Sequence, residues 1–195
     1  MSHYFVTPDE PLVTHEFEAR VFGRELTFLS ASGVFSGDRL DLGTSVLLRE
    51  VEPPITGRVL DLGCGVGTIA VGLALASPGV SVDAIDVNER AVELTGLNAA
   101  RHGVGDRVQA MTPDEVPADV LYDEIWSNPP IRIGKEALHE LLLTWLGRLR
   151  PEGVAYLVVG RNLGADSLQR WLVEQGHPTE RIASAKGFRV LRAHV

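Results

Sequence analysis

The chain has 195 residues, of which 45% are hydrophobic and 23% are charged, with a formal net charge of −8. This composition is typical of one soluble globular domain, and the acidic balance argues against indiscriminate nucleic-acid binding. The single cysteine, Cys64, excludes an intramolecular disulfide and a cysteine-rich metal site. No apolar run approaches the roughly 20 residues of a membrane helix, and residues 1–10 lack the regions of a signal peptide. We therefore expect a cytoplasmic protein, and because the six histidines show no metal-ligand spacing, we predict no metal.

The charge is distributed unevenly along the chain. Residues 1–130 contain 8 Lys+Arg and 20 Asp+Glu, whereas residues 131–195 contain 10 Lys+Arg and 6 Asp+Glu. Such an asymmetry can mark a face that binds an anionic partner. For charge alone, a chance distribution over a folded surface is the simpler interpretation.

The first 50 residues predict a small β-rich appendage. Residues 17–22 and 25–29 favour two short strands joined by a turn at residues 23–24. Residues 44–50 can form a short helix with Thr44 or Ser45 near its cap. Because residues 1–50 are too few to hold a core of their own, we expect them to pack on a main domain over residues 51–195.

From residue 51 onward, strand and helix patterns alternate. The predicted strands are residues 58–62, 80–86, 108–111, 121–127, 153–160 and 188–195, and the predicted helices are residues 68–76, 88–102, 135–149 and 166–175. This alternation predicts an α/β fold with a mostly parallel sheet covered on both faces.

A glycine-rich loop follows the first strand of the main domain, in the sequence Asp61-Leu62-Gly63-Cys64-Gly65-Val66-Gly67. Glycines permit a sharp strand-to-helix turn and a close approach of a ligand to the backbone. A carboxylate before the loop would repel a pyrophosphate but would pair with an ammonium or sulfonium group. Asp61 therefore favours S-adenosylmethionine over a nicotinamide cofactor, and the plain alternative is a tight turn without a ligand.

Two further acids follow the next strands. Asp86 ends the second strand, about 20 residues beyond the glycine loop, where an acid can accept hydrogen bonds from ribose hydroxyls. Asp114 follows the third strand, where adenine is expected. Taken alone, each is also compatible with an ordinary solvated loop carboxylate.

The tetrapeptide Ser127-Asn128-Pro129-Pro130 ends the fourth strand. Neither proline can donate to a sheet ladder, so the strand runs into a stiff turn with Asn128 at its tip. We expect this strand to lie beside the first, with its tip at the same cleft. The Asn128 Oδ1 atom and the Pro129 carbonyl can then accept hydrogen bonds from a target amine and position its lone pair. The alternative is an ordinary Asn-Pro-Pro turn.

Together these motifs resemble the class I S-adenosylmethionine-dependent methyltransferases that act on nitrogen. Over residues 16–195 the chain more closely resembles the methyltransferase small family, which includes guanine-N2 methyltransferases of small-subunit ribosomal RNA and shorter archaeal relatives. Besides the two motifs above, the resemblance rests on four segments, residues 32–36, 42–44, 128–136 and 186–191.

The resemblance implies a Rossmann-like fold with a seven-stranded sheet, S-adenosylmethionine as the cofactor and a role for each motif residue. Asn128, Pro129 and Pro130 would form the catalytic turn, and Asn128 would also lie against the cofactor. The other cofactor-binding residues that the resemblance implies are Gly43, Thr44, Asp61, Gly63, Gly65, Gly67, Asp86 and Asp114. Two departures are visible: Ile131 stands where many ribosomal RNA members have phenylalanine, and this chain holds only one copy of the motifs.

Basic residues near the Asn128 motif suggest how RNA would be held. The chain has 16 arginines and only 2 lysines, and both lysines fall in segments that carry the resemblance. We expect a basic rim that contacts phosphates without reading sequence, with Ile131 packing on the base. The predicted rim residues are Arg132, Lys135, Arg161, Lys186 and Arg189.

The sequence thus predicts an N-methyltransferase acting on an exocyclic amine, with guanine N2 of 16S ribosomal RNA as the leading target. The base would be presented unpaired or flipped. A protein glutamine amide or a small-molecule amine remains an alternative target, and a non-catalytic cofactor- or RNA-binding module remains an alternative of another class.

Overall fold

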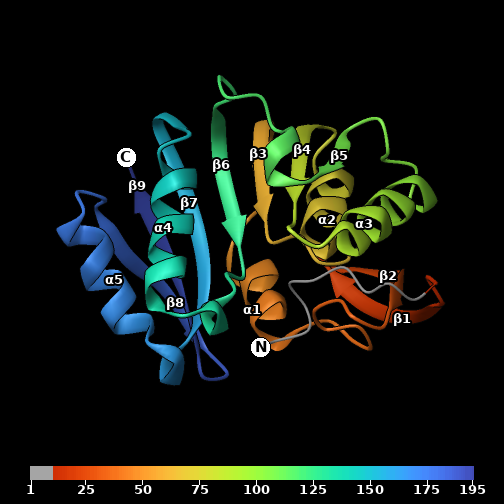
Figure 1. Cartoon of the computed structure of the whole chain (residues 1–195), viewed down its shortest axis with the longest axis horizontal. Coiled ribbons are helices and arrows are strands. Elements are labelled where there is room, and N and C mark those ends of the chain that lie inside the picture. Colours follow the sequence, from red (N-terminus) through yellow and green to blue (C-terminus); the bar gives the residue numbers. More distant parts are fainter. Residues whose placement is uncertain (1–10) are drawn as a thin grey trace.

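The computed structural model describes residues 11–195, so residues 1–10, on which the signal-peptide expectation was based, lie outside the described part. A seven-stranded sheet forms the centre of the molecule, and a two-stranded hairpin lies at one side of it (Figure 1). Among the helices of residues 11–195, none has the length and apolar character needed to cross a membrane.

The central sheet is mostly parallel, as predicted. Its strand order is β5-β4-β3-β6-β7-β9-β8, and β9 runs in the opposite direction to the other six strands. The strands are β3 (Thr56–Leu62), β4 (Gly79–Ile85), β5 (Val108–Met111), β6 (Tyr122–Ser127), β7 (Leu149–Gly160), β8 (Thr179–Ala185) and β9 (Phe188–His194). The pairing of β6 with β3 confirms that the Asn128 strand lies beside the glycine-loop strand. The strand order reverses between β3 and β6, which is where doubly wound sheets bind ligands.

Helices cover both faces of this sheet, and the sheet separates two apolar cores. The helices are α1 (Leu42–Glu50), α2 (Thr68–Ala76), α3 (Glu89–Arg101), α4 (Lys135–Leu146) and α5 (Ala165–Glu174). Alternate side chains of β3 point to opposite faces, so Val59 joins the core that contains α1, α2 and α3, while Leu60 joins the core that contains α4 and α5. Three short 3₁₀ helices, Pro113–Glu115, Ile131–Ile133 and Arg161–Leu163, follow β5, β6 and β7.

The N-terminal segment packs into the same core as α2 and α3. Its strands, β1 (Thr14–Val21) and β2 (Arg24–Ala31), form an antiparallel hairpin. The Asn98 side chain of α3 binds the edge of β2, because its Oδ1 accepts from the Leu29 N–H at 2.7 Å and its Nδ2 donates to the Leu29 carbonyl at 2.9 Å. Helix α1 contacts β1 of this hairpin as well as β7 and β9 of the central sheet. A domain division at residue 50 stays a prediction.

Three local predictions differ from the structure. The α1 helix begins at Leu42 with Asp41 as its N-cap, earlier than the predicted cap at Thr44 or Ser45. The β1–β2 turn is at Phe22-Gly23, where both residues have positive φ, and not at residues 23–24. Strand β8 was not predicted, because it is an edge strand whose side chains are all exposed or half-buried and show no apolar alternation. The remaining predicted elements lie within about four residues of the observed bounds.

Candidate active site

The glycine-rich loop is fixed to the end of the neighbouring strand. The N–H groups of Gly63 and Cys64 both donate to the Ile85 carbonyl, at 2.8 and 3.0 Å. Gly63, Gly65 and Gly67 have φ values of +77°, +57° and +81°, which side-chain-bearing residues rarely adopt. The loop therefore turns sharply from β3 into α2.

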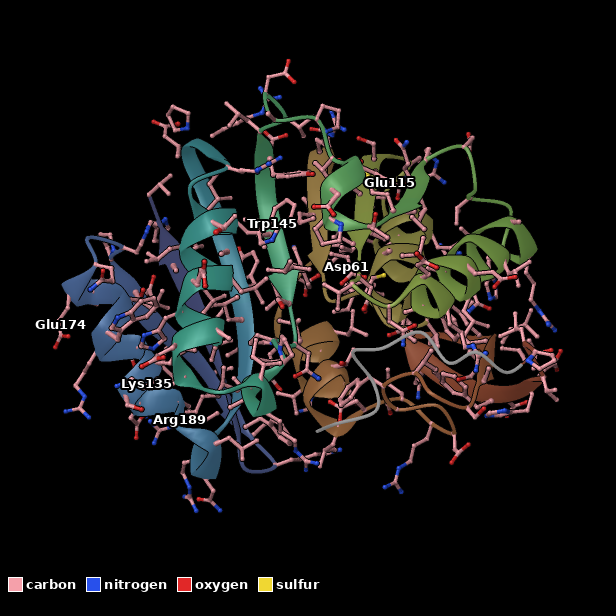
Figure 2. All side chains as sticks on the ribbon, viewed as in Figure 1. Asp61, Glu115, Lys135, Trp145, Glu174 and Arg189 are labelled. Atoms are coloured by element: carbon pink, nitrogen blue, oxygen red, sulfur yellow. The ribbon has the colours of Figure 1, made fainter. Side chains whose placement is uncertain are left out.

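The carboxyl group of Asp61 is fully buried beneath this loop. Its Oδ2 accepts from the Ala70 N–H at 3.0 Å, whereas its Oδ1 has no hydrogen-bond partner among the described residues. Burial raises the pKa of Asp61 to about 7, and the negative charge of Asp86 adds to the rise. A buried acceptor without a partner is costly, so an ammonium or sulfonium group within its reach would be stabilised here. Figure 2 shows Asp61 in the middle of the molecule.

The loop leaves open space on one side and packs tightly on the other. A Cβ atom built on Gly63 would meet nothing within 4 Å, whereas one on Gly67 would lie 2.8 Å from Thr95 Cγ2. The backbone at Gly63 is thus accessible to a ligand, and Gly67 is required for packing against α3. Cys64 is buried and its pKa is raised by burial, in keeping with a small residue in a tight turn.

Asp86, directly after β4, connects the end of that strand to the glycine loop. Its Oδ2 accepts from the Gly65 N–H and its Oδ1 from the Asn88 N–H, each at 3.0 Å. Burial raises the pKa of Asp86, and these hydrogen bonds oppose the rise. Asp114 lies apart from this network, exposed in the 3₁₀ helix after β5.

The tip of β6 is locked against the tip of β3. The Ser127 hydroxyl donates to the Leu62 carbonyl at 2.7 Å, which places Asn128 next to the start of the glycine loop. The Asn128 Nδ2 donates to Asp41 Oδ1 at 2.7 Å and to Thr44 Oγ1 at 3.1 Å. Sequence analysis missed Asp41, and the only local signal for it was its place before a short helix, where an aspartate is a favoured N-cap.

One pocket brings several predicted site residues together. Thr44, Gly63, Gly65 and Asn128 line it, and so does Asp41. The other lining residues are Phe17, Phe35, Ser36, Arg39, Leu40, Cys64, Val66, Thr68 and Ile69. The N-terminal segment and the main domain therefore both contribute walls to the pocket.

Gly43 has a packing reason to be glycine. A Cβ atom there would lie 2.8 Å from Phe188 Cε1 and 3.0 Å from Asp41 Oδ1. The missing side chain thus leaves room for the phenylalanine ring of β9 and for the carboxyl group of Asp41. Direct contact of Gly43 with a cofactor stays a prediction.

The turn after Asn128 is short and tightly hydrogen-bonded. The Pro129 carbonyl accepts from the Ile131 N–H at 2.8 Å, and the Pro130 carbonyl accepts from the Ile133 N–H at 3.1 Å. A carbonyl oxygen has two lone pairs, so Pro129 retains one for a further donor. Ile131 is half-buried and packs against the core that contains α4 and α5.

The predicted basic rim is only partly available. Arg132, Lys135, Arg161 and Lys186 are exposed, and the Arg161 N–H donates to the Gly187 carbonyl at 2.8 Å, which joins two of the rim segments. Arg189 differs, because it forms an ion pair with Asp166 and its side chain is only 14% exposed. Figure 2 shows Lys135 and Arg189 on the flank of the molecule where α4 and α5 lie.

Comparison with known proteins places these motifs in a family. Residues 25–192 match the model of the methyltransferase small domain. The chain is 34% identical over 178 residues to the protein YbxB of Bacillus subtilis (strain 168), described as uncharacterized, and covers 88% of its length. It is also 34% identical over 143 residues to ribosomal RNA small subunit methyltransferase C of Shewanella loihica (strain ATCC BAA-1088 / PV-4). This match covers 71% of the present chain and 41% of the Shewanella protein.

A similar solved structure is that of the T. thermophilus 16S rRNA N2 G1207 methyltransferase (RsmC) in complex with AdoMet and guanosine. The TM-score is 0.82 at 25% sequence identity, over 96% of this chain and 52% of that one. The present chain thus spans about half the length of the methyltransferases named for ribosomal RNA.

Proposed function

Because the chain belongs to the methyltransferase small domain family and is an S-adenosylmethionine-dependent methyltransferase, we propose that it methylates an exocyclic amine, guanine N2 of 16S ribosomal RNA. The observation that carries this proposal is the position of Asn128. Its side chain lines the same pocket as Gly63 and Gly65, at the reversal point of the sheet. The similarity to an enzyme whose solved complex contains AdoMet and guanosine supports this choice of target.

The residues around the glycine loop suit the methyl donor. The unpartnered Oδ1 of Asp61 would accept from its ammonium group, and the open side of Gly63 would admit its methionine part. Asp86 would hold its ribose, since each carboxylate oxygen has lone pairs beyond those that bind Gly65 and Asn88. Thr44 would close the pocket from the N-terminal side, and Asp114 would approach the adenine.

When bound, this cofactor supplies an electrophilic methyl group: the amine lone pair forms the new N–C bond, the electron pair of the broken S–C bond stays on sulfur, and the nitrogen then loses a proton. The protein orients the amine before this step. Asn128 Oδ1 and the second lone pair of the Pro129 carbonyl would accept from the amine hydrogens and turn its lone pair toward the methyl group. A strong base is not needed before attack, because the proton leaves afterwards.

The target base and its RNA would be held outside the pocket. Ile131 would provide an apolar contact for the base without stacking. The exposed Arg132, Lys135, Arg161 and Lys186 would contact phosphates, whereas Arg189 would act mainly through its ion pair with Asp166.

Incubation with labelled S-adenosylmethionine tests the proposal. Unmodified 16S RNA, small ribosomal subunits and a protein fraction are offered in parallel, with Asn128→Ala as the control. Label in RNA that digests to N2-methylguanosine supports the proposal, and label confined to protein rejects it in favour of an amide target. Absence of both labelling and cofactor binding in isothermal titration would favour a non-catalytic RNA-binding module.

A further inference from the structure

The side-chain amide of Asn128 is held in one orientation by the N-terminal segment. Its Nδ2 lies 2.7 Å from Asp41 Oδ1 and 3.1 Å from Thr44 Oγ1. An amide nitrogen has two hydrogens to donate, whereas the amide oxygen only accepts. Both hydrogens of Asn128 therefore have partners outside the substrate position, and Oδ1 is the atom left for a substrate.

Asp41, and not Thr44, decides this orientation. A hydroxyl can donate or accept, so Thr44 would tolerate either end of the amide. A carboxylate only accepts. If the amide of Asn128 were reversed, its Oδ1 would lie at the 2.7 Å position beside Asp41 Oδ1, and two acceptor oxygens would repel each other.

Asp41 is itself fixed in place by the local backbone. It is the N-cap of α1, and the same Oδ1 accepts from the Thr44 N–H at 3.1 Å. The absence of a side chain at Gly43 leaves room for this carboxyl group, because a Cβ atom there would lie 3.0 Å from Asp41 Oδ1. One carboxylate oxygen thus caps a helix and orients an amide from a strand 87 residues away.

We propose that Asp41 is a positioning residue that turns Asn128 Oδ1 toward the reacting group and so selects a substrate atom that donates N–H hydrogens. This inference rests on the proposed function, in which Asn128 faces the target amine. A carbonyl oxygen or an unprotonated ring nitrogen would meet another acceptor at this position and would be rejected. An exocyclic amino or amide NH₂ group would be accepted.

Hydrogen exchange tests the orientation without any substrate. Asp41→Ser keeps an N-cap side chain but is too short to reach Asn128, whereas Asp41→Asn keeps both the cap and an acceptor. The signal of the Asn128 Nδ2 hydrogens is identified by its loss in Asn128→Ala. We expect slow exchange in the wild-type protein and in Asp41→Asn, and exchange at least tenfold faster in Asp41→Ser. Equal exchange rates in the wild type and in Asp41→Ser would overturn the proposal.

A matched control separates this effect from a general loss of nearby negative charge. Asp38 is also an aspartate of the segment before α1, but its side chain is 93% exposed and pairs with His15 at 3.1 Å. Asp38→Ala should leave the Asn128 signal unchanged.

Kinetics on unmodified 16S RNA test the consequence for catalysis. Asp41→Ser should lower kcat by about tenfold to a hundredfold, the factor for losing a charge-assisted hydrogen bond, with little change in the RNA KM. In an Asn128→Ala background the same substitution should cause no further loss, because the amide that it orients is gone. An equal loss in both backgrounds would contradict the proposal. If the wild-type enzyme leaves this RNA unlabelled, the guanine assignment fails, and the exchange experiment still decides the role of Asp41.

Discussion

Replacing Asp61 with asparagine should make the stability of the free protein less dependent on pH and should weaken cofactor binding. The substitution keeps an oxygen that can accept from the Ala70 N–H but removes a buried charge. Burial raises the pKa of Asp61 from 3.8 to about 7, so between these values the folded protein holds a proton that the unfolded chain has released. The protonated carboxyl of Asp61 therefore makes its full contribution to the free energy of unfolding below about pH 4, and this contribution is lost as the pH rises toward 7.

The size of the effect follows from this shift. Above the unfolded-state pKa and below the folded-state pKa of about 7, each pH unit changes the free energy of unfolding by about 1.4 kcal/mol. Between pH 5 and pH 8, this dependence acts over about two pH units, from pH 5 to about pH 7. The free energy of unfolding of the wild type should therefore fall by about 2–3 kcal/mol more than that of Asp61→Asn over this range. Asp86, whose pKa burial also raises, is present in both proteins, so the difference between the two curves reports Asp61 together with its electrostatic coupling to Asp86.

Urea denaturation at several pH values measures the stability difference, and isothermal titration measures the cofactor. Asp61→Asn should bind S-adenosylmethionine about tenfold to a hundredfold more weakly, because a charge-assisted hydrogen bond contributes about 1.5–3 kcal/mol. Binding to the wild type at pH 6 should release a proton, since a cation near Oδ1 favours the ionised carboxylate.

Two results would refute this reasoning. Parallel stability curves for the wild type and Asp61→Asn between pH 5 and pH 8 would mean that burial does not destabilise the charge. Unchanged cofactor affinity in Asp61→Asn would mean that Oδ1 is not where the cation binds.

Further predictions concern the loop and the rim. Gly67→Ala should cost about 1–3 kcal/mol in urea denaturation, because its Cβ would lie 2.8 Å from Thr95 Cγ2 at a φ of +81°. Gly63 also has a positive φ, but a Cβ atom there would meet no atoms within 4 Å. Gly63→Ala should therefore cost less stability than Gly67→Ala and should instead lower cofactor affinity in titration. The reverse pattern would contradict the assignment of the open side of the loop to the ligand. Lys135→Glu should weaken RNA binding in filter assays. It should also reduce the slope of log affinity against log salt concentration by about the amount that one phosphate contact contributes. Arg24→Glu, a charge reversal at another exposed position, on the β1–β2 hairpin, should change neither the affinity for RNA nor its salt dependence. Equal effects of the two substitutions would refute a localised rim.

Sequence reasoning located the parts of the site that depend on local backbone signals. The α2 helix and strand β5 were predicted at their observed bounds, because glycines, prolines and apolar runs mark their ends. The pairing of β6 with β3 followed from the βα order, so Asn128 could be placed beside the glycine loop before any coordinates.

The contacts that sequence reasoning missed join residues far apart in the chain. Asp41 meets Asn128 across 87 positions, and neither residue type nor spacing points to that contact. The ion pair of Arg189 with Asp166 likewise removes one predicted rim residue from the free surface. Strand β8 owes its conformation to its ladder with β9, which a local pattern cannot reveal.

Identification of the methylated nucleoside tests the central claim most directly. Unmodified 16S RNA is incubated with labelled S-adenosylmethionine and either the wild-type enzyme or Asn128→Ala, then digested to nucleosides and separated. We predict label in N2-methylguanosine with the wild type and a loss of at least a hundredfold with Asn128→Ala. Label in a different nucleoside or only in protein, or equal labelling by the two enzymes, would contradict the account.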